Sequence, residues 1–168
     1  HGYHLGEHDF WAKVSLRDES AGIPLIISVP GKKPAVCHSF VELLDLYPSL
    51  SKLCGLDVPA RLQGKDLSPL LDDPTRRVRE TAFCVAPMRK GFLLREDKWA
   101  YIQYGEKAEG GIELFDVKKD PRQHTNLAKS VEHAKTVTRF KAQMTEKLQA
   151  VRTNDLGLGY KKPRRRKQ

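Results

Sequence analysis

The first nine residues contain the densest group of side chains in this sequence that could bind a metal ion or transfer protons. The possible ligands are three histidines and two acidic residues: His1, His4, Glu7, His8 and Asp9. Residues 4–8 fit the pattern H-x-x-E-H, in which two imidazoles one helical turn apart hold zinc and the glutamate activates a water molecule. That chemistry requires a helix, and Gly6 at its centre disfavours one. A zinc hydrolase is therefore one hypothesis among several.

Two other interpretations of these histidines are open. An amino-terminal histidine can chelate copper through its amine and its imidazole, provided that His1 is the mature terminus. The histidines can also be surface residues of a loop, because residues 1–22 are rich in histidine, glycine and charged side chains. Composition alone favours the surface loop.

The elements that would position this loop begin with a short apolar run. Residues 23–29 read IPLIISV and are closed by a Pro-Gly pair, which predicts a strand buried on both faces. Such a strand belongs in a parallel sheet, and its neighbouring strands must come from elsewhere. Residues 39–54 place apolar side chains at three- and four-residue steps, which predicts a helix that Pro48 interrupts or restarts and Gly55 ends.

The second half of the chain has the pattern of a small sheet with a helix across one face. Residues 57–79, rich in proline, are expected to form a connecting loop. Four short runs of aromatic and branched residues then predict an antiparallel meander over residues 81–85, 91–95, 99–104 and 112–117. Residues 130–152 predict one long helix with Ser130 as its N-cap. Its apolar stripe consists of Val137, Phe140, Met144, Leu148 and Val151.

The charge of the chain is concentrated at its end. Residues 161–168 read KKPRRRKQ, and removing these six basic residues from the net charge of +9 leaves +3. Such a segment can bind a polyanion, so a noncatalytic basic module that binds nucleic acid or a sulfated glycan is an alternative function; a solvated, disordered terminus is equally consistent. No apolar run approaches the roughly 20 residues that span a bilayer. Three cysteines without a C-x-x-C pair give no disulfide framework.

Four blocks of sequence, in this order, carry a family resemblance. The first reads HGYHLGEH, with WAK at 11–13 and the apolar run at 23–31. The others are VELLDLYPSL at 41–50, LQGKDLSPLL at 62–71 and ELFDV at 113–117. Together they closely resemble the type I, formylglycine-dependent sulfatases, in their iduronate-2-sulfatase-like branch. The resemblance covers nearly all of residues 1–155.

The resemblance implies an α/β fold, namely the C-terminal part of an alkaline-phosphatase-like sulfatase fold that ends in a small antiparallel sheet packed on a long helix. Residues 1–75 would be the end of the large α/β domain, with the active-site loop, the buried strand and the helix. Residues 76–155 would form the C-terminal subdomain, and 156–168 a basic, disordered tail. A periplasmic or secreted location is expected by the same resemblance.

Sulfatases hydrolyse sulfate esters with a formylglycine, made from the cysteine of Cys-x-Pro-Ser-Arg, beside a calcium ion. In that picture the position of His1 implies a metal ligand, and the position of Lys13 implies contact with the sulfate oxygens. A divalent cation and a fixed ammonium group stabilise the charge that develops on those oxygens and on the leaving oxygen. We therefore expect Ca²⁺ and formylglycine in the full-length enzyme, and a sulfated small molecule or glycan as its substrate.

The sequence also departs from the family pattern. It contains no Cys-x-Pro-Ser-Arg: the segment Cys84 to Arg89 has one residue too many before its proline. The aspartate expected before His1 is absent, and Gln123 stands where glutamate is common. We therefore expect no catalytic nucleophile in this chain, an upstream sulfatase part as its partner, and no activity of the chain alone. An unpaired strand at 23–29 is expected to cause either self-association that covers it or a local rearrangement.

Overall fold

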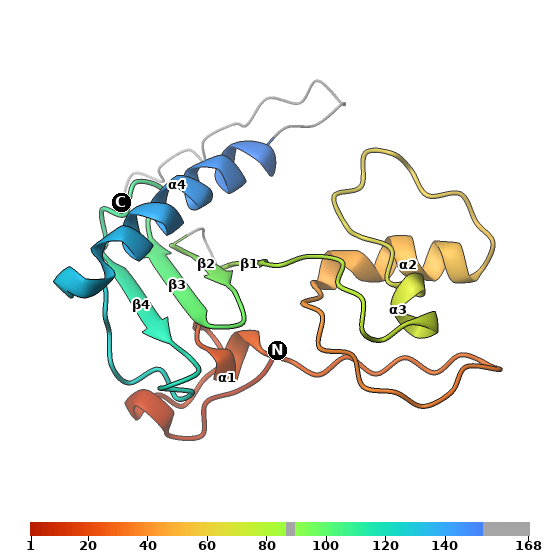
Figure 1. The fold of residues 1–168 in the computed structure, drawn as a ribbon, viewed down its shortest axis with the longest axis horizontal. Coiled ribbons are helices and arrows are strands. Elements are labelled where there is room, and N and C mark those ends of the chain that lie inside the picture. The colour runs from red at the N-terminus through yellow and green to blue at the C-terminus, as the bar shows by residue number, and fades with distance from the viewer. Residues whose placement is uncertain (87–89, 153–168) are drawn as a thin grey trace, which may run out of the picture.

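A computed structural model describes residues 1–86 and 90–152, and a four-stranded antiparallel sheet is its central element. The strands are β1 (Ala82–Val85), β2 (Gly91–Arg95), β3 (Trp99–Tyr104) and β4 (Ile112–Asp116), and they lie side by side in chain order (Figure 1). Phe92 faces Gln103 across β2 and β3, and Ala100 faces Phe115 across β3 and β4. The predicted meander is confirmed, with strand ends within one residue of those expected.

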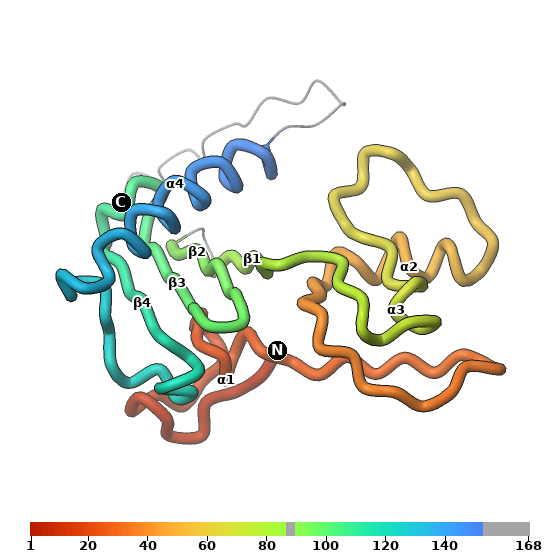
Figure 2. The backbone as a smooth tube through the Cα atoms, viewed as in Figure 1, coloured from red at the N-terminus to blue at the C-terminus, as the bar shows by residue number. Residues whose placement is uncertain are grey.

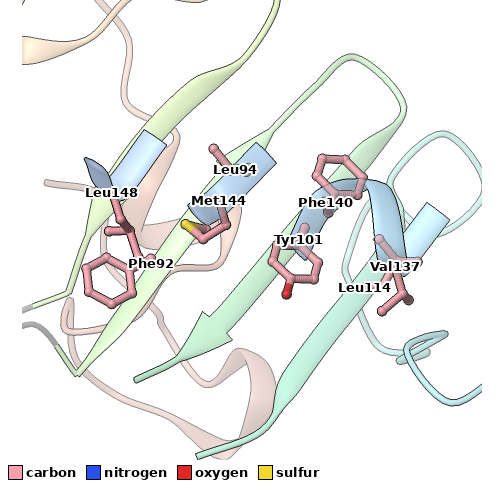
Figure 3. Close-up of a cluster of buried hydrophobic side chains, with 8 residues drawn as sticks. All are labelled: Phe92, Leu94, Tyr101, Leu114, Val137, Phe140, Met144 and Leu148. Atoms are coloured by element: carbon pink, nitrogen blue, oxygen red, sulfur yellow. The ribbon is translucent and has the colours of Figure 1, made fainter. Parts of the chain in front are cut away.

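One face of the sheet is covered by the long helix α4 (Ala134–Ala150), which follows a 3₁₀ turn, η4 (Val131–His133). Figure 3 shows the cluster of buried side chains that the helix and the strands share. Its members are Phe92, Leu94, Tyr101, Leu114, Val137, Phe140, Met144 and Leu148. The predicted helix is confirmed from Ala134, and its stripe is confirmed except for Val151, which follows the helix and is half-buried. Ser130 precedes the 3₁₀ turn, and its side chain makes no capping hydrogen bond.

The opposite face of the sheet is covered by the beginning of the chain. Leu16 and the short helix α1 (Asp18–Ala21) pack there. Because side chains alternate along a strand, this face buries a second set of residues: Leu93, Ala100, Ile102, Phe115 and Val117. The sheet is thus the middle layer of three, and residues far apart in sequence meet on it (Figure 1).

Two short helices form a separate group beside the sheet. A 3₁₀ turn, η2 (Leu43–Asp45), leads into α2 (Leu46–Leu53), and α3 (Ser68–Asp72) packs on α2. The helix predicted over 39–54 is therefore confirmed in part, with Pro48 in its first turn, where a missing N–H is tolerated. Gly55 follows the helix at a φ of 69°, as expected of a residue that ends a helix. Helix α3 lies inside the predicted 57–79 loop.

The prediction of a buried strand over residues 23–29 is wrong for this structure. Residues 22–29 have no regular secondary structure, and Figure 2 shows the segment after α1 running outward and back before α2. Ile26 is 90% exposed. A strand exists only where neighbouring strands accept and donate its backbone hydrogen bonds, and residues 23–29 pair with neither outer strand of this sheet, β1 or β4.

Exposed large apolar side chains are unevenly distributed along the described residues. All but two, Val85 and Val131, lie between Tyr3 and Leu56.

Within residues 1–86 and 90–152, no helix is long and apolar enough to cross a membrane. The predicted tail at 156–168 and the end of the Cys84 to Arg89 segment lie outside the described residues.

Candidate functional site

The N-terminal loop, residues 1–21, folds as a closed hairpin followed by α1. The amide of His4 donates to the carbonyl of Ala12 at 2.9 Å, and that of Gly6 to Phe10 at 3.2 Å. Gly6 has a φ of 116°, and a Cβ there would lie 3.1 Å from the Trp11 indole, so the tight turn requires glycine. The sequence HGYHLGEH thus forms a hairpin and not a helix.

The histidines of this hairpin do not have the geometry that the zinc pattern requires. Residues 7–9 form a 3₁₀ turn, η1 (Glu7–Asp9), with a left-handed φ of 58° at His8. Backbone amides of Glu7 and Leu5 donate to the Glu7 carboxylate and lower its pKa. Among residues 1–86 and 90–152, no group of three His, Cys, Asp or Glu side chains is placed to hold a metal ion.

His4 and His8 instead make internal contacts within the N-terminal loop and with a distant turn. His4 is 1% exposed, and its Nε2 lies 2.7 Å from the Ser15 hydroxyl. The Nε2 of His8 lies 3.6 Å from a carboxylate oxygen of Glu19, and its ring is 4.8 Å from that of His124. These contacts make both imidazoles part of the loop's own packing.

His1 and Lys13, the two residues implied as metal ligand and sulfate contact, are both exposed. His1 lies next to α1, because the amide of the following residue, Gly2, donates to the carbonyl of Ser20 at 3.1 Å. Lys13 follows Ala12, the carbonyl partner of His4, on the other arm of the hairpin. Both residues therefore lie on one loop, each beside a backbone hydrogen bond that fixes it.

Arg17 anchors this loop to the sheet and to the turn after it. Its Nη1 donates to the carbonyl of Gln123 at 2.7 Å and its Nη2 to Glu113 at 3.1 Å, and the guanidinium lies 4.7 Å from the centroid of the Phe115 ring. The planar, permanently charged guanidinium suits such a mixed site of hydrogen bonds and ring contact. The Glu113 carboxylate also accepts from Tyr104, whose burial raises its pKa to about 12.

Asp18 provides a second anchor beside Arg17. Its amide donates to the Gln123 side-chain oxygen at 3.1 Å, and its carboxylate accepts three hydrogen bonds from Arg95 on β2, at 2.8 to 3.1 Å. Gln123 is 1% exposed and has a φ of 55°. These anchors were not predicted from the sequence, in which only the unusual residue at Gln123 pointed to this turn.

The described residues do not by themselves complete a calcium site. Calcium takes six to eight oxygen ligands, whereas His1 offers an imidazole nitrogen and no suitable group of acidic residues surrounds it. What the arrangement presents is an exposed ammonium group at Lys13 on a backbone that is fixed on both sides. This geometry can bind an anion.

Comparison with known proteins shows similarity to sulfatases over most of the chain. The family "N-sulphoglucosamine sulphohydrolase, C-terminal" matches residues 6–153. Arylsulfatase K of Gallus gallus is 31% identical over 76% of this chain and 26% of its own length. The Delta 4,5-hexuronate-2-O-sulfatase of Bacteroides thetaiotaomicron is 32% identical over 87% of this chain and 32% of its own length.

Solved structures agree with these matches. A Bacteroides thetaiotaomicron protein described as a sulfatase superposes with a TM-score of 0.77 at 29% identity, over 89% of this chain and 34% of its own. A protein solved in complex with its substrate, D-glucosamine-2-N,6-O-disulfate, gives a TM-score of 0.72 at 26% identity, over 89% of this chain and 32% of its own. The chain thus spans about a quarter to a third of the length of these relatives. It belongs to the sulfatases, with the fold of the C-terminal part of their alkaline-phosphatase-like architecture.

Proposed function

We propose that this chain is the C-terminal part of a formylglycine-dependent sulfatase of the iduronate-2-sulfatase-like branch, and that it supplies one wall of the active site. The observation that carries the proposal is Lys13, an exposed ammonium group on a hairpin that Arg17 and Asp18 fasten to the sheet. Hydrolysis of a sulfate ester builds negative charge on the nonbridging and leaving oxygens. A cation held in a fixed place stabilises that charge more in the transition state than in the ground state.

The nucleophile and most of the metal ligands would lie in the part of the sulfatase that this chain does not contain. The chain lacks Cys-x-Pro-Ser-Arg, and His1 would contribute at most one ligand to a Ca²⁺ ion held by other residues. We therefore expect the chain alone to be inactive and the formylglycine to be formed elsewhere in the polypeptide. The role of His1 follows from its position in the family motif, and that of Lys13 is supported also by the geometry of the hairpin.

The partner of this chain would be the remaining α/β part of a sulfatase. The exposed apolar residues cluster between Tyr3 and Leu56, in the first third of the chain, and relatives are three to four times longer than this chain. Buried polar atoms without a hydrogen-bond partner among the described residues also belong to the N-terminal loop: His4 Nδ1, His8 Nε2, Glu19 Oε2 and Ser20 Oγ. Both observations favour contacts with residues from outside this chain. In the absence of that partner, self-association would cover the apolar residues.

We propose a sulfated saccharide as the substrate class. Two relatives that match over most of this chain act on sulfated sugars: one is a hexuronate-2-O-sulfatase, and one was solved with a glucosamine disulfate. The position of the sulfate on the sugar would be set by residues outside this chain.

A chimaera tests the proposal. The amino-terminal two thirds of the Bacteroides thetaiotaomicron hexuronate sulfatase, joined to this chain, should hydrolyse a sulfated hexuronate, whereas the chain alone should not. Replacing Lys13 by alanine should lower kcat/KM by about 10²- to 10³-fold, the loss typical of removing one charge-stabilising donor. Lys141→Ala, which removes an exposed lysine from α4, is the matched control. Turnover by the chain alone, or an active chimaera indifferent to Lys13→Ala, would contradict the proposal.

A further inference from the structure

A continuous set of hydrogen bonds runs across the N-terminal loop and passes Lys13 on both sides. On one side, the carbonyl of Ala12 accepts the amide of His4 at 2.9 Å. On the other, the Ser15 hydroxyl lies 2.7 Å from Nε2 of His4 and accepts the amide of Arg17 at 3.2 Å. A single residue, His4, therefore holds the chain before Lys13 through its backbone and the chain after Lys13 through its ring.

The same set of hydrogen bonds continues into the C-terminal subdomain. Arg17 donates to the Gln123 carbonyl, and the amide of Asp18 donates to the Gln123 side chain. His4 and Gln123 are each 1% exposed, so water competes little for these contacts. The hairpin is thus tied to a turn about a hundred residues later in the sequence.

A lysine side chain cannot fix its own ammonium group. Four methylenes separate Nζ from the backbone, each with freedom to rotate, and Lys13 is exposed. The volume that the ammonium group can reach is therefore set by where the backbone at residue 13 is held. Misplacing a catalytic group by about 1 Å can cost on the order of 10²-fold in rate.

We infer that Ser15 is a positioning residue for Lys13, acting through His4 and Arg17, and that Gln123 extends this restraint to the turn that follows β4. The inference rests on the proposed function in one respect only, namely that Lys13 contacts the sulfate. Ser15 itself touches no substrate in this account. Its hydroxyl joins the ring of His4 to the backbone amide of Arg17.

Hydrogen exchange on the 168-residue chain tests the restraint without any activity. In Ser15→Ala, the amides of His4 and Gly6, which donate across the hairpin, should exchange about thirtyfold faster, since two hydrogen bonds of roughly 1 kcal/mol each are lost and about 1.4 kcal/mol is a factor of ten. Ser15→Thr keeps the hydroxyl and should exchange like the wild type. The amides of β3 report on the rest of the fold and should not change. Ser28→Ala, at an exposed serine of the extended segment, is the control.

A second pair of variants tests the link to the sheet. Gln123→Leu keeps the size of the side chain but removes the oxygen that accepts the Asp18 amide and the nitrogen that donates to the Asp18 carboxylate, whereas Gln123→Asn keeps a neutral amide. The leucine variant should accelerate exchange at His4 and Gly6 more than the asparagine variant does. Equal exchange in Ser15→Ala and Ser15→Thr, together with equal exchange in the two Gln123 variants, would overturn the inference.

Kinetics of the chimaera separate positioning from folding. Ser15→Ala should lower kcat by about tenfold or more with a smaller change in KM, and Ser15→Thr should have the kcat of the wild type. The reason is that a displaced Lys13 ammonium group loses more of its interaction with the transition state than with the bound substrate. A loss shared equally by the alanine and threonine variants would show that the site tolerates no change and would overturn the role of the hydroxyl. An active chimaera that ignores Lys13→Ala while exchange still responds to Ser15→Ala would refute the proposed role of Lys13 and leave the restraint standing.

Discussion

Replacing Arg79 by alanine tests the ion pair that joins Asp45, just before α2, to the segment that leads into β1. Asp45 is fully buried, and its carboxylate accepts from both terminal nitrogens of Arg79, whose side chain is only 10% exposed. The amides of Glu42 and Lys65 donate to the same carboxylate at 2.7 Å each. Arg79→Ala leaves that carboxylate buried without its counter-ion, so the free energy of unfolding should fall by about 3–5 kcal/mol.

The assay is urea and thermal unfolding at pH 7, followed by far-ultraviolet circular dichroism. A loss of this size lowers the melting temperature of a chain of this length by roughly 10 °C. Lys32→Ala, which breaks the exposed pair with Asp72, is the control and should cost under about 1 kcal/mol. Equal stability of Arg79→Ala and Lys32→Ala would refute the reasoning.

The same pair predicts a pH dependence. Burial by itself raises the pKa of Asp45, but the hydrogen bonds from Arg79 and from the two backbone amides outweigh it and hold the pKa below its usual value. The unfolded chain then binds this proton more tightly than the folded chain, so the stabilisation is complete above about pH 5 and is lost as the pH falls below about 3.9. The stability gap between the wild type and Asp45→Asn should therefore narrow on acidification. A gap that stays constant from pH 7 to pH 3 would contradict this assignment.

Two further predictions concern the core and the tail. Phe140→Ala, at a fully buried ring stacked 5.3 Å from Tyr101, should cost about 3–5 kcal/mol in urea unfolding, while Val131→Ala at a 92% exposed side chain should change stability by less than about 0.5 kcal/mol. Deleting residues 161–168 removes six positive charges and should abolish any salt-dependent binding to heparin, measured by chromatography. The activity of the chimaera should not change. Heparin binding that survives the deletion would place the polyanion site in the body of the chain.

The sheet and α4 were predictable because every partner that they need is present in the chain. Strands β1 to β4 pair only with their sequence neighbours, and Tyr101 and Phe140 close one core between the third strand and the helix. Hydrophobic periodicity is a sufficient signal when the surface that it predicts to be buried can be buried locally. Residues 23–29 have an equally clear pattern, but they pair neither with β1 nor with β4, the two outer strands of the sheet. The pattern alone did not form the strand.

The candidate site was less predictable than the fold for a different physical reason. Arg17 is one of 30 basic residues, and nothing in its local sequence distinguishes it from an ordinary surface arginine. Its role becomes visible only when the sheet brings Glu113 and Phe115 beneath it and a left-handed turn presents the carbonyl of Gln123. The position of Lys13 therefore depends on residues about a hundred positions later. If Lys13 contacts the sulfate as proposed, a change in the 120–123 turn should lower the activity of the chimaera, because that turn holds Arg17 although it touches no substrate.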